Sequence, residues 1–145
     1  MMNEALLYPS YEIIGGEKIL APSASSYHNR VMGGFYIDIA NYVRKNHCGE
    51  VFTDNVDVHL PDGSMYKPDL FIVKSENESI INWEGTVHGV PDMVVEIISK
   101  SSRKKDTTIK KDTYELNGVK EYWIIDPFFK CADKEYTPSA CLSKT

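Results

Sequence analysis

Hydrophobic and polar residues follow one another along this chain in patterns that predict both strands and helices. YEIIGGEKIL (residues 11–20) holds two short apolar runs around a Gly-Gly pair, which predicts a β-hairpin. Apolar residues recur at helical spacing over residues 26–46, so an amphipathic helix is expected there. A second helix is expected at about 103–117, because Gly118 suits the left-handed position just past a helix end.

The remaining apolar runs predict strands. VFTDNVDVHL (51–60) alternates toward its end, PDG (61–63) predicts a turn, and DLFIV (69–73) reads as the return strand of a meander. MVVEIIS (93–99) and EYWIID (121–126) follow, with the second helix between them, which is the pattern of a crossover between parallel strands. We therefore expect a mixed α+β domain whose central sheet is antiparallel on one side and parallel on the other.

Length and composition indicate one domain. The 145 residues are 42% hydrophobic and 26% charged, which suffices for a core of its own. No run approaches the roughly 20 apolar residues that a membrane span needs, and the N-terminus lacks a signal-peptide pattern, so we expect a cytoplasmic protein with no membrane partner. Cys48, Cys131 and Cys141 form no paired motif and are expected to be reduced thiols.

The net charge of −5 argues against a surface that is positive throughout, but residues 100–111 form a local basic segment. Its candidate nucleic-acid-binding residues are Lys100, Arg103, Lys104, Lys105 and Lys111. The alternative, which charge alone favours, is a solvated loop and helix face.

Glu96 is the first candidate for chemistry, because it interrupts the apolar run of MVVEIIS. A buried carboxylate without a partner is costly and recruits a cation or a donor. Asp69, at the start of the preceding core strand, can point into the same cleft. Two neighbouring carboxylates repel each other unless a divalent cation lies between them, and oxygen ligands with waters suit Mg²⁺ or Mn²⁺.

A basic residue completes this constellation. Asp106, Lys110 and Tyr114 are spaced four apart and share one face of the second predicted helix. Lys110 could orient or deprotonate a water, or offset charge on a pentavalent phosphate, beside a metal that lowers the pKa of water. The alternatives stay open at this point: a carboxylate that pairs with a neighbouring lysine or amide for Glu96, a solvated lysine for Lys110 and a core ring for Tyr114.

The motifs of residues 67–127 resemble the Uma2 family, a group of restriction-endonuclease-like proteins in the PD-(D/E)XK nuclease superfamily. The matching pieces are Pro68-Asp69 before an apolar strand, GVPDMVVEIIS before a basic loop, the spacing of Asp106, Lys110 and Tyr114, and NGVKEYWIIDP. YEII-GGEKI and GEVFTDNVDVHL extend the likeness over most of residues 11–127.

This resemblance implies a restriction-endonuclease-like core with helices flanking a central mixed sheet and an N-terminal hairpin. It implies Asp69 and Glu96 as metal ligands and Lys110 as a catalytic lysine that comes from the helix. Glu17 and His28 match further positions that recur in the family, with Asp106 and Tyr114 beside the site. For His28, capping of the first helix is an equally good interpretation.

The sequence departs from the family pattern at three places. Lys100 replaces a proline, Gly15 replaces an aspartate, and residues 128–145 form a shortened tail after a core of about 11–127. We expect this tail to leave a sheet edge exposed, which invites pairing in a homodimer.

The leading hypothesis is a Mg²⁺- or Mn²⁺-dependent endonuclease that hydrolyses phosphodiester bonds of DNA. The main alternative is a catalytically inactive, nuclease-derived module that binds nucleic acid or another partner. A hydrolase for a different phosphate ester is the third. No P-loop, GxSxG or HExxH motif points to other chemistry.

Overall fold

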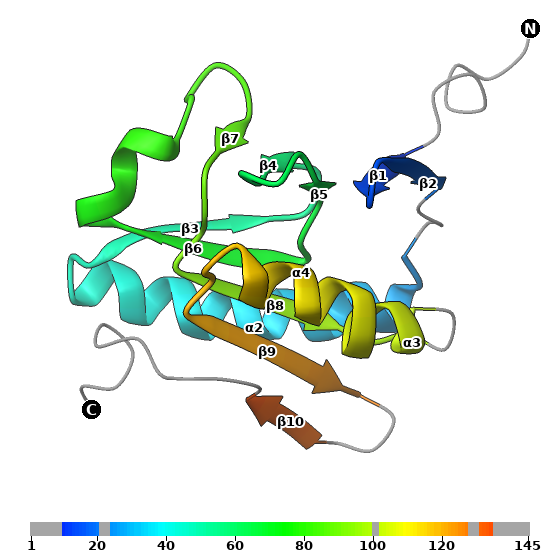
Figure 1. The fold of residues 1–145 in the computed structure, drawn as a ribbon. Helices are drawn as coiled ribbons and strands as arrows, with labels where there is room; N and C mark the ends of the chain where they lie inside the picture. The colour runs from blue at the N-terminus through cyan, green and yellow to red at the C-terminus, as the bar shows by residue number, and fades with distance from the viewer. Residues whose placement is uncertain (1–9, 21–23, 100–101, 128–130, 135–145) are drawn as a thin grey trace, which may run out of the picture.

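The computed structural model describes residues 10–20, 24–99, 102–127 and 131–134, the last four by their backbone (Figure 1). Helices lie on both faces of a central sheet, and a second sheet covers one end of the same face as the C-terminal helices. The predicted mixed α+β class is therefore confirmed. Among the described residues, no helix combines the length and apolar character that crossing a membrane requires.

The central sheet has the strand order β10-β9-β8-β6-β3. Its strands are β3 (Gly49–Thr53), β6 (Leu70–Lys74), β8 (Met93–Ile97), β9 (Glu121–Asp126) and β10 (Cys131–Lys134). β3, β6 and β8 are antiparallel neighbours, whereas β8 and β9 are parallel and joined through the C-terminal helices. The predicted crossover is confirmed.

The second sheet has the order β2-β1-β5-β4-β7 and contains the predicted hairpin. Its strands are β1 (Tyr11–Ile14), β2 (Glu17–Leu20), β4 (Val58–His59), β5 (Met65–Tyr66) and β7 (Val87–His88). β1 pairs with β5 through Ile13 and Met65, so the hairpin is an integral part of the fold and its inner face packs on the core through Ile14.

Two apolar layers hold the central sheet between its helices. Helix α2 (Ser26–Lys45) covers one face, where Met32 and Val43 pack on alternate residues of the strands such as Ile72 and Val95. The helix begins where predicted, because the Ser25 side chain accepts a hydrogen bond from the backbone N–H of His28 at 3.1 Å. The opposite face packs against Tyr114 of the C-terminal helices.

The second predicted helix consists of three successive segments. They are α3 (Arg103–Lys105), the π-helical turn η2 (Asp106–Lys110) and α4 (Lys111–Leu116). Gly118 follows with a φ of +91°, the left-handed conformation expected just after a helix end. A 3-10 helix, η1 (Ser75–Ile80), lies between β6 and β7.

The predicted meander is wrong in one respect. Residues 51–60 do not form one strand, because Asn55 adopts a φ of +70° and turns the chain after β3. β3 pairs directly with β6, and the turn at 61–63 instead joins β4 to β5 in the second sheet.

Two further expectations need correction. β10 pairs antiparallel with β9, so the chain after Pro127 does form a short hairpin and covers the edge that was expected to be exposed. Cys48 is disulfide-bonded, so the expectation of three reduced thiols is wrong at this position. The side chains of Cys131 and Cys141 lie outside the described part of the chain.

Candidate active site

Three carboxylates form a row across neighbouring strands of the central sheet. Leu70 of β6 pairs with Val95 of β8 on one side and with Thr53 of β3 on the other. The preceding residue, Asp69, continues both registers by one residue. This places Asp69 opposite Glu96 on one side and beside Asp54 on the other. Directly opposed residues of antiparallel strands point to the same face, so the register places Asp69 and Glu96 on one face of the sheet, and their convergence on a metal stays a prediction.

Asp69 is held by two donors to one oxygen. Its Oδ2 accepts a hydrogen bond from the backbone N–H of Ile97 at 2.7 Å and lies 3.1 Å from Nε2 of His28. The hydrogen bond to Asp69 raises the pKa of His28, although burial opposes this rise. His28 thus does more than begin a helix: α2 places its ring against the carboxylate row.

Glu96 is buried, with 2% of its surface exposed, as the interrupted apolar run predicts. Its Oε1 accepts hydrogen bonds from Nζ of Lys110 at 3.1 Å and from the Tyr114 hydroxyl at 3.2 Å. Burial raises the pKa of Glu96 well above its ordinary value, Lys110 opposes the rise, and the charge of Asp69 adds to it. Electrostatic interaction therefore links the two predicted ligands.

Lys110 lies in a cluster of three buried carboxylates. Its Nζ is 2.8 Å from Oε1 of Glu12, 3.1 Å from Oε1 of Glu96 and 3.8 Å from Oδ1 of Asp106. Burial alone would lower the pKa of Lys110, but these carboxylates outweigh burial and raise it far above its ordinary value. Lys110 is therefore an ammonium ion throughout the physiological range. We call these four residues the Lys110 cluster.

Asp106 and Lys110 lie at the two ends of the π-helical turn η2. Both residues are buried, as is Tyr114 one turn later. A π turn adds a residue per turn and often occurs at functional sites, since it moves a side chain off the regular helical face. The Tyr122 hydroxyl donates to the carbonyl of Asp106 at 2.8 Å, which holds this turn against β9.

Glu12 is the member of the cluster that the sequence interpretation missed. It is 2% exposed on β1, and its oxygens also accept from the backbone N–H of Lys67 at 3.1 Å and from Nζ of Lys105 at 3.0 Å. The available signal was the one used for Glu96, a glutamate inside an apolar run, here YEII. Asp54 was also missed; burial and the charge of Asp69 raise its pKa.

The remaining predicted residues are Glu17 and those of the basic segment. Glu17 is exposed on β2, opposite Ile14, and within the described residues it makes no hydrogen bond or ion pair with the Lys110 cluster. In the basic segment, Arg103 pairs with Asp126 at 2.6 Å and Lys105 with Glu12 at 3.0 Å. Lys104 is exposed and Lys111 is half-buried, whereas Lys100 lies outside the described residues.

The carboxylate row has the donor chemistry of a hard divalent cation. The hydrogen bonds of Asp69 and Glu96 to described residues each use a single oxygen, Oδ2 and Oε1. Across the described part of the chain, no group of three or more His, Cys, Asp or Glu side chains is arranged to hold a metal ion. Two carboxylates nevertheless fit Mg²⁺, which is commonly bound through one or two carboxylates and keeps several waters.

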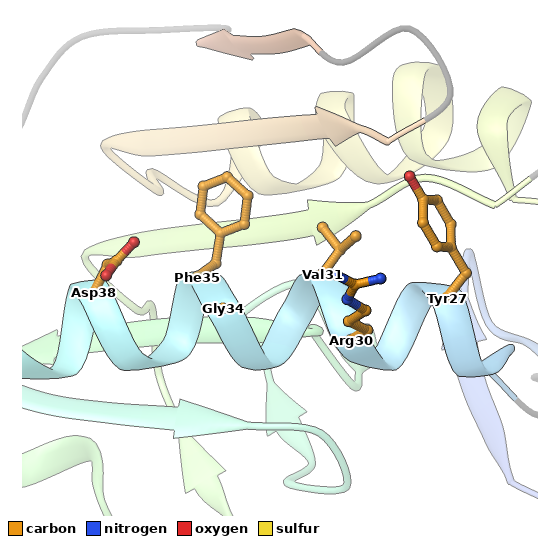
Figure 2. A pocket seen from close by; sticks show the side chains of 6 residues that line it. All are labelled: Tyr27, Arg30, Val31, Gly34, Phe35 and Asp38. Atoms are coloured by element: carbon orange, nitrogen blue, oxygen red, sulfur yellow. The ribbon is translucent and has the colours of Figure 1, made fainter.

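An open cavity of about 450 Å³ lies elsewhere, along one side of α2 (Figure 2). Its lining residues all come from that helix, among them Tyr27, Val31 and Phe35. The Tyr27 hydroxyl donates to the carbonyl of Pro127 at 3.4 Å, just after β9. No residue of the carboxylate row or of the Lys110 cluster lines this cavity, so it is separate from the candidate site.

Replacing Tyr114 with phenylalanine tests the hydrogen bond that reaches Glu96. The hydroxyl is fully buried and donates to Oε1, so its loss is expected to lower the free energy of unfolding by about 1–3 kcal/mol. Urea denaturation followed by circular dichroism measures the change. Tyr36→Phe, a half-buried ring on α2, is the matched control. Equal stability of the wild type and Tyr114→Phe would contradict the hydrogen bond.

The fold, a mixed sheet with helices on both faces, is nuclease-like. The model of the Uma2 family, described as "Putative restriction endonuclease", matches residues 5–130. The chain therefore belongs to the Uma2 family.

A solved structure agrees with this assignment. The chain is similar to "a putative nuclease belonging to DUF820" from Anabaena variabilis ATCC 29413, with a TM-score of 0.69 and 19% sequence identity. The match covers 91% of this chain and 79% of that one, and at this identity it shows the fold. None of the curated proteins compared with the chain matches it.

Proposed function

We propose that this protein is an endonuclease that hydrolyses phosphodiester bonds of DNA with Mg²⁺ or Mn²⁺ as its cofactor. The observation that supports this most is the register that sets Asp69 opposite Glu96, with the ammonium of Lys110 3.1 Å from Glu96. Family membership supports the nuclease class, and the metal and the DNA substrate are our inference from the site.

Asp69 and Glu96 would hold the cation. When bound, the cation would supply Lewis-acid chemistry: it would polarise the phosphate and lower the pKa of a water. His28 orients Asp69 through Nε2, and Tyr114 and Lys110 orient Glu96 through Oε1. These contacts leave the second oxygen of each carboxylate for the cation.

Lys110 contributes positive charge to the site and does not act as a base. Its raised pKa keeps the amine protonated, so it cannot accept a proton from water at neutral pH. Of the three roles open to this lysine, orientation of a water and charge compensation are favoured over deprotonation. Burial raises the pKa of Glu96, and the Lys110 ammonium opposes this rise, so it acts toward the ionised form that binds a metal.

Cleavage of defined substrates tests the proposal directly. Purified protein is incubated with supercoiled plasmid, linear duplex, single-stranded DNA and RNA, with Mg²⁺, Mn²⁺ or EDTA. We expect internal cuts in DNA that require the divalent ion. Salt-sensitive binding without any turnover would instead favour the catalytically inactive module, and hydrolysis of small phosphate esters alone would favour the third hypothesis.

The basic segment gives a prediction about binding. Arg103 and Lys105 are already paired with carboxylates, so the exposed Lys104 is expected to contribute most to phosphate contact. Lys104→Ala should weaken DNA binding for all sequences and reduce the slope of log K against log salt by about 1. Fluorescence anisotropy at several salt concentrations measures it. Lys45→Ala, at the far end of α2, is the control, and an unchanged slope in Lys104→Ala would contradict this role.

Assembly as a homodimer remains a prediction. β10 covers the edge of β9 that was expected to pair between subunits. This edge therefore gives less reason to expect a dimer than the sequence did.

A further inference from the structure

We propose that Glu12 of the N-terminal hairpin is a positioning residue, which holds the ammonium of Lys110 against Glu96. The inference rests on the proposed function for its consequence in catalysis, and it assigns to the hairpin a direct part in building the site. Glu12 acts through Lys110, whose amine it shares with Glu96 of the carboxylate row.

Glu12 is buried, and both of its carboxylate oxygens make polar contacts. Oε1 is 2.8 Å from Nζ of Lys110, the shortest of the three carboxylate contacts of that amine. The same oxygen accepts from the backbone N–H of Lys67, and Oε2 accepts from Nζ of Lys105. Both oxygens therefore have donors, so the carboxylate has little freedom to move.

Strand pairing around Glu12 fixes the position of its side chain. Glu12 pairs with Ile19 in the hairpin register, and the neighbouring Ile13 pairs with Met65 of β5. Lys67, which donates to Glu12, lies two residues before Asp69. The hairpin thus connects the lysine on one side of the site to the segment that carries Asp69.

Glu12 attracts the Lys110 amine from a different part of the fold than the other two carboxylates do. Glu96 and Asp106 also attract Lys110, but only Glu12 approaches it from the second sheet. The rings of Tyr66 and Tyr114 lie on the same side of the sheet, and the Lys110 amine is 5.4 Å from the Tyr66 ring centroid. Without Glu12, the amine would lose its nearest partner and could shift toward Asp106, away from the Glu96 oxygen.

Chemical labelling of Lys110 tests the position without any need for activity. An amine-acylating reagent reacts with Lys110 only when the amine leaves its carboxylates, and peptide mass spectrometry gives the rate. Glu12→Gln keeps the shape and removes the charge, and it should raise this rate at least about tenfold, since breaking a buried ion pair costs considerably more than a tenfold change requires. Glu12→Asp, which keeps the charge, should recover part of the protection.

Two controls separate positioning from general loss of stability. Glu50→Gln removes an exposed strand glutamate and should leave the labelling rate unchanged. Ile14→Ala loosens the packing of the same hairpin without touching Lys110, and it should label at close to the wild-type rate at a temperature where it is folded.

Kinetics then gives the consequence for the proposed reaction. Glu12→Gln should lower kcat by about a hundredfold with little change in KM, because a small misplacement of a catalytic group has an effect of this size. Wild-type labelling of Lys110 in Glu12→Gln, or equal labelling in Ile14→Ala and Glu12→Gln, would overturn the assignment. If the wild type cleaves no nucleic acid, the proposed function fails while the labelling result still decides the role of Glu12.

Discussion

Replacing Asp69 with asparagine, or Glu96 with glutamine, is expected to reduce metal-dependent DNA cleavage at least about a thousandfold. Each change preserves the shape of the side chain and removes one of the two charges proposed to hold the cation. A bound metal supplies several kcal/mol of transition-state stabilisation, and each 1.4 kcal/mol corresponds to a tenfold change in rate. Single-turnover cleavage of a labelled duplex at saturating Mn²⁺ measures the loss.

The asparagine and glutamine variants should still fold. In Asp69→Asn the amide oxygen can accept from the N–H of Ile97, and in Glu96→Gln it can accept from Tyr114 and Lys110. Asp112→Asn, on the exposed side of α4, is the matched control and should cleave at the wild-type rate. Wild-type cleavage by both Asp69→Asn and Glu96→Gln would remove the proposed active site.

Replacing Lys110 with methionine is expected to lower the free energy of unfolding by about 3–5 kcal/mol, the range found when one partner of a buried ion pair is removed. Lys110 is 4% exposed, and its loss leaves Glu12, Glu96 and Asp106 buried without their shared ammonium. Urea denaturation at neutral pH, followed by circular dichroism, gives the difference.

A surface lysine supplies the comparison for Lys110→Met. Lys120 is exposed before β9, and Lys120→Met should change the free energy of unfolding by less than about 0.5 kcal/mol. If Lys110→Met unfolds at the same urea concentration as the wild type, the amine does not stabilise the cluster of carboxylates, and its role in holding Glu96 fails with it.

Local patterns in the sequence were sufficient for the elements that surround the site. The Gly-Gly pair predicts the hairpin, helical spacing predicts α2, and Gly118 predicts where α4 ends. The alternation around Glu96 correctly places it among the residues that face α4, because a strand has a period of two. In these cases the determining interactions lie within a few residues of one another.

Long-range pairing could not be read in the same way. The chain leaves β3 at Asn55, contributes β4 and β5 to the second sheet, and returns to pair β6 with β3. Residues 51–60 alternate only toward their end, and the local sign of this turn is an asparagine, Asn55. The partners of a strand depend on which sheet buries it, and this is a property of the whole fold.

The sequence pattern also did not predict which charged residues pair with one another. Glu12 and Lys110 are far apart in sequence, and only the pairing of β1 with β5 brings the hairpin over the C-terminal helices. For the same reason, a cluster of basic residues predicted a positive surface, whereas Arg103 and Lys105 are paired with Asp126 and Glu12. Charge composition counts groups but does not show which of them are neutralised within the fold.

Binding of Mn²⁺ in the absence of nucleic acid tests the carboxylate row most directly. Isothermal titration calorimetry, with free Mn²⁺ confirmed by electron paramagnetic resonance, is carried out on the wild type, Asp69→Asn, Glu96→Gln and Asp112→Asn. We predict that the wild type and Asp112→Asn bind the ion alike, and that Asp69→Asn and Glu96→Gln each bind it at least about tenfold more weakly. Equal Mn²⁺ affinity in all four proteins, or no binding by the wild type, would contradict a metal site at Asp69 and Glu96.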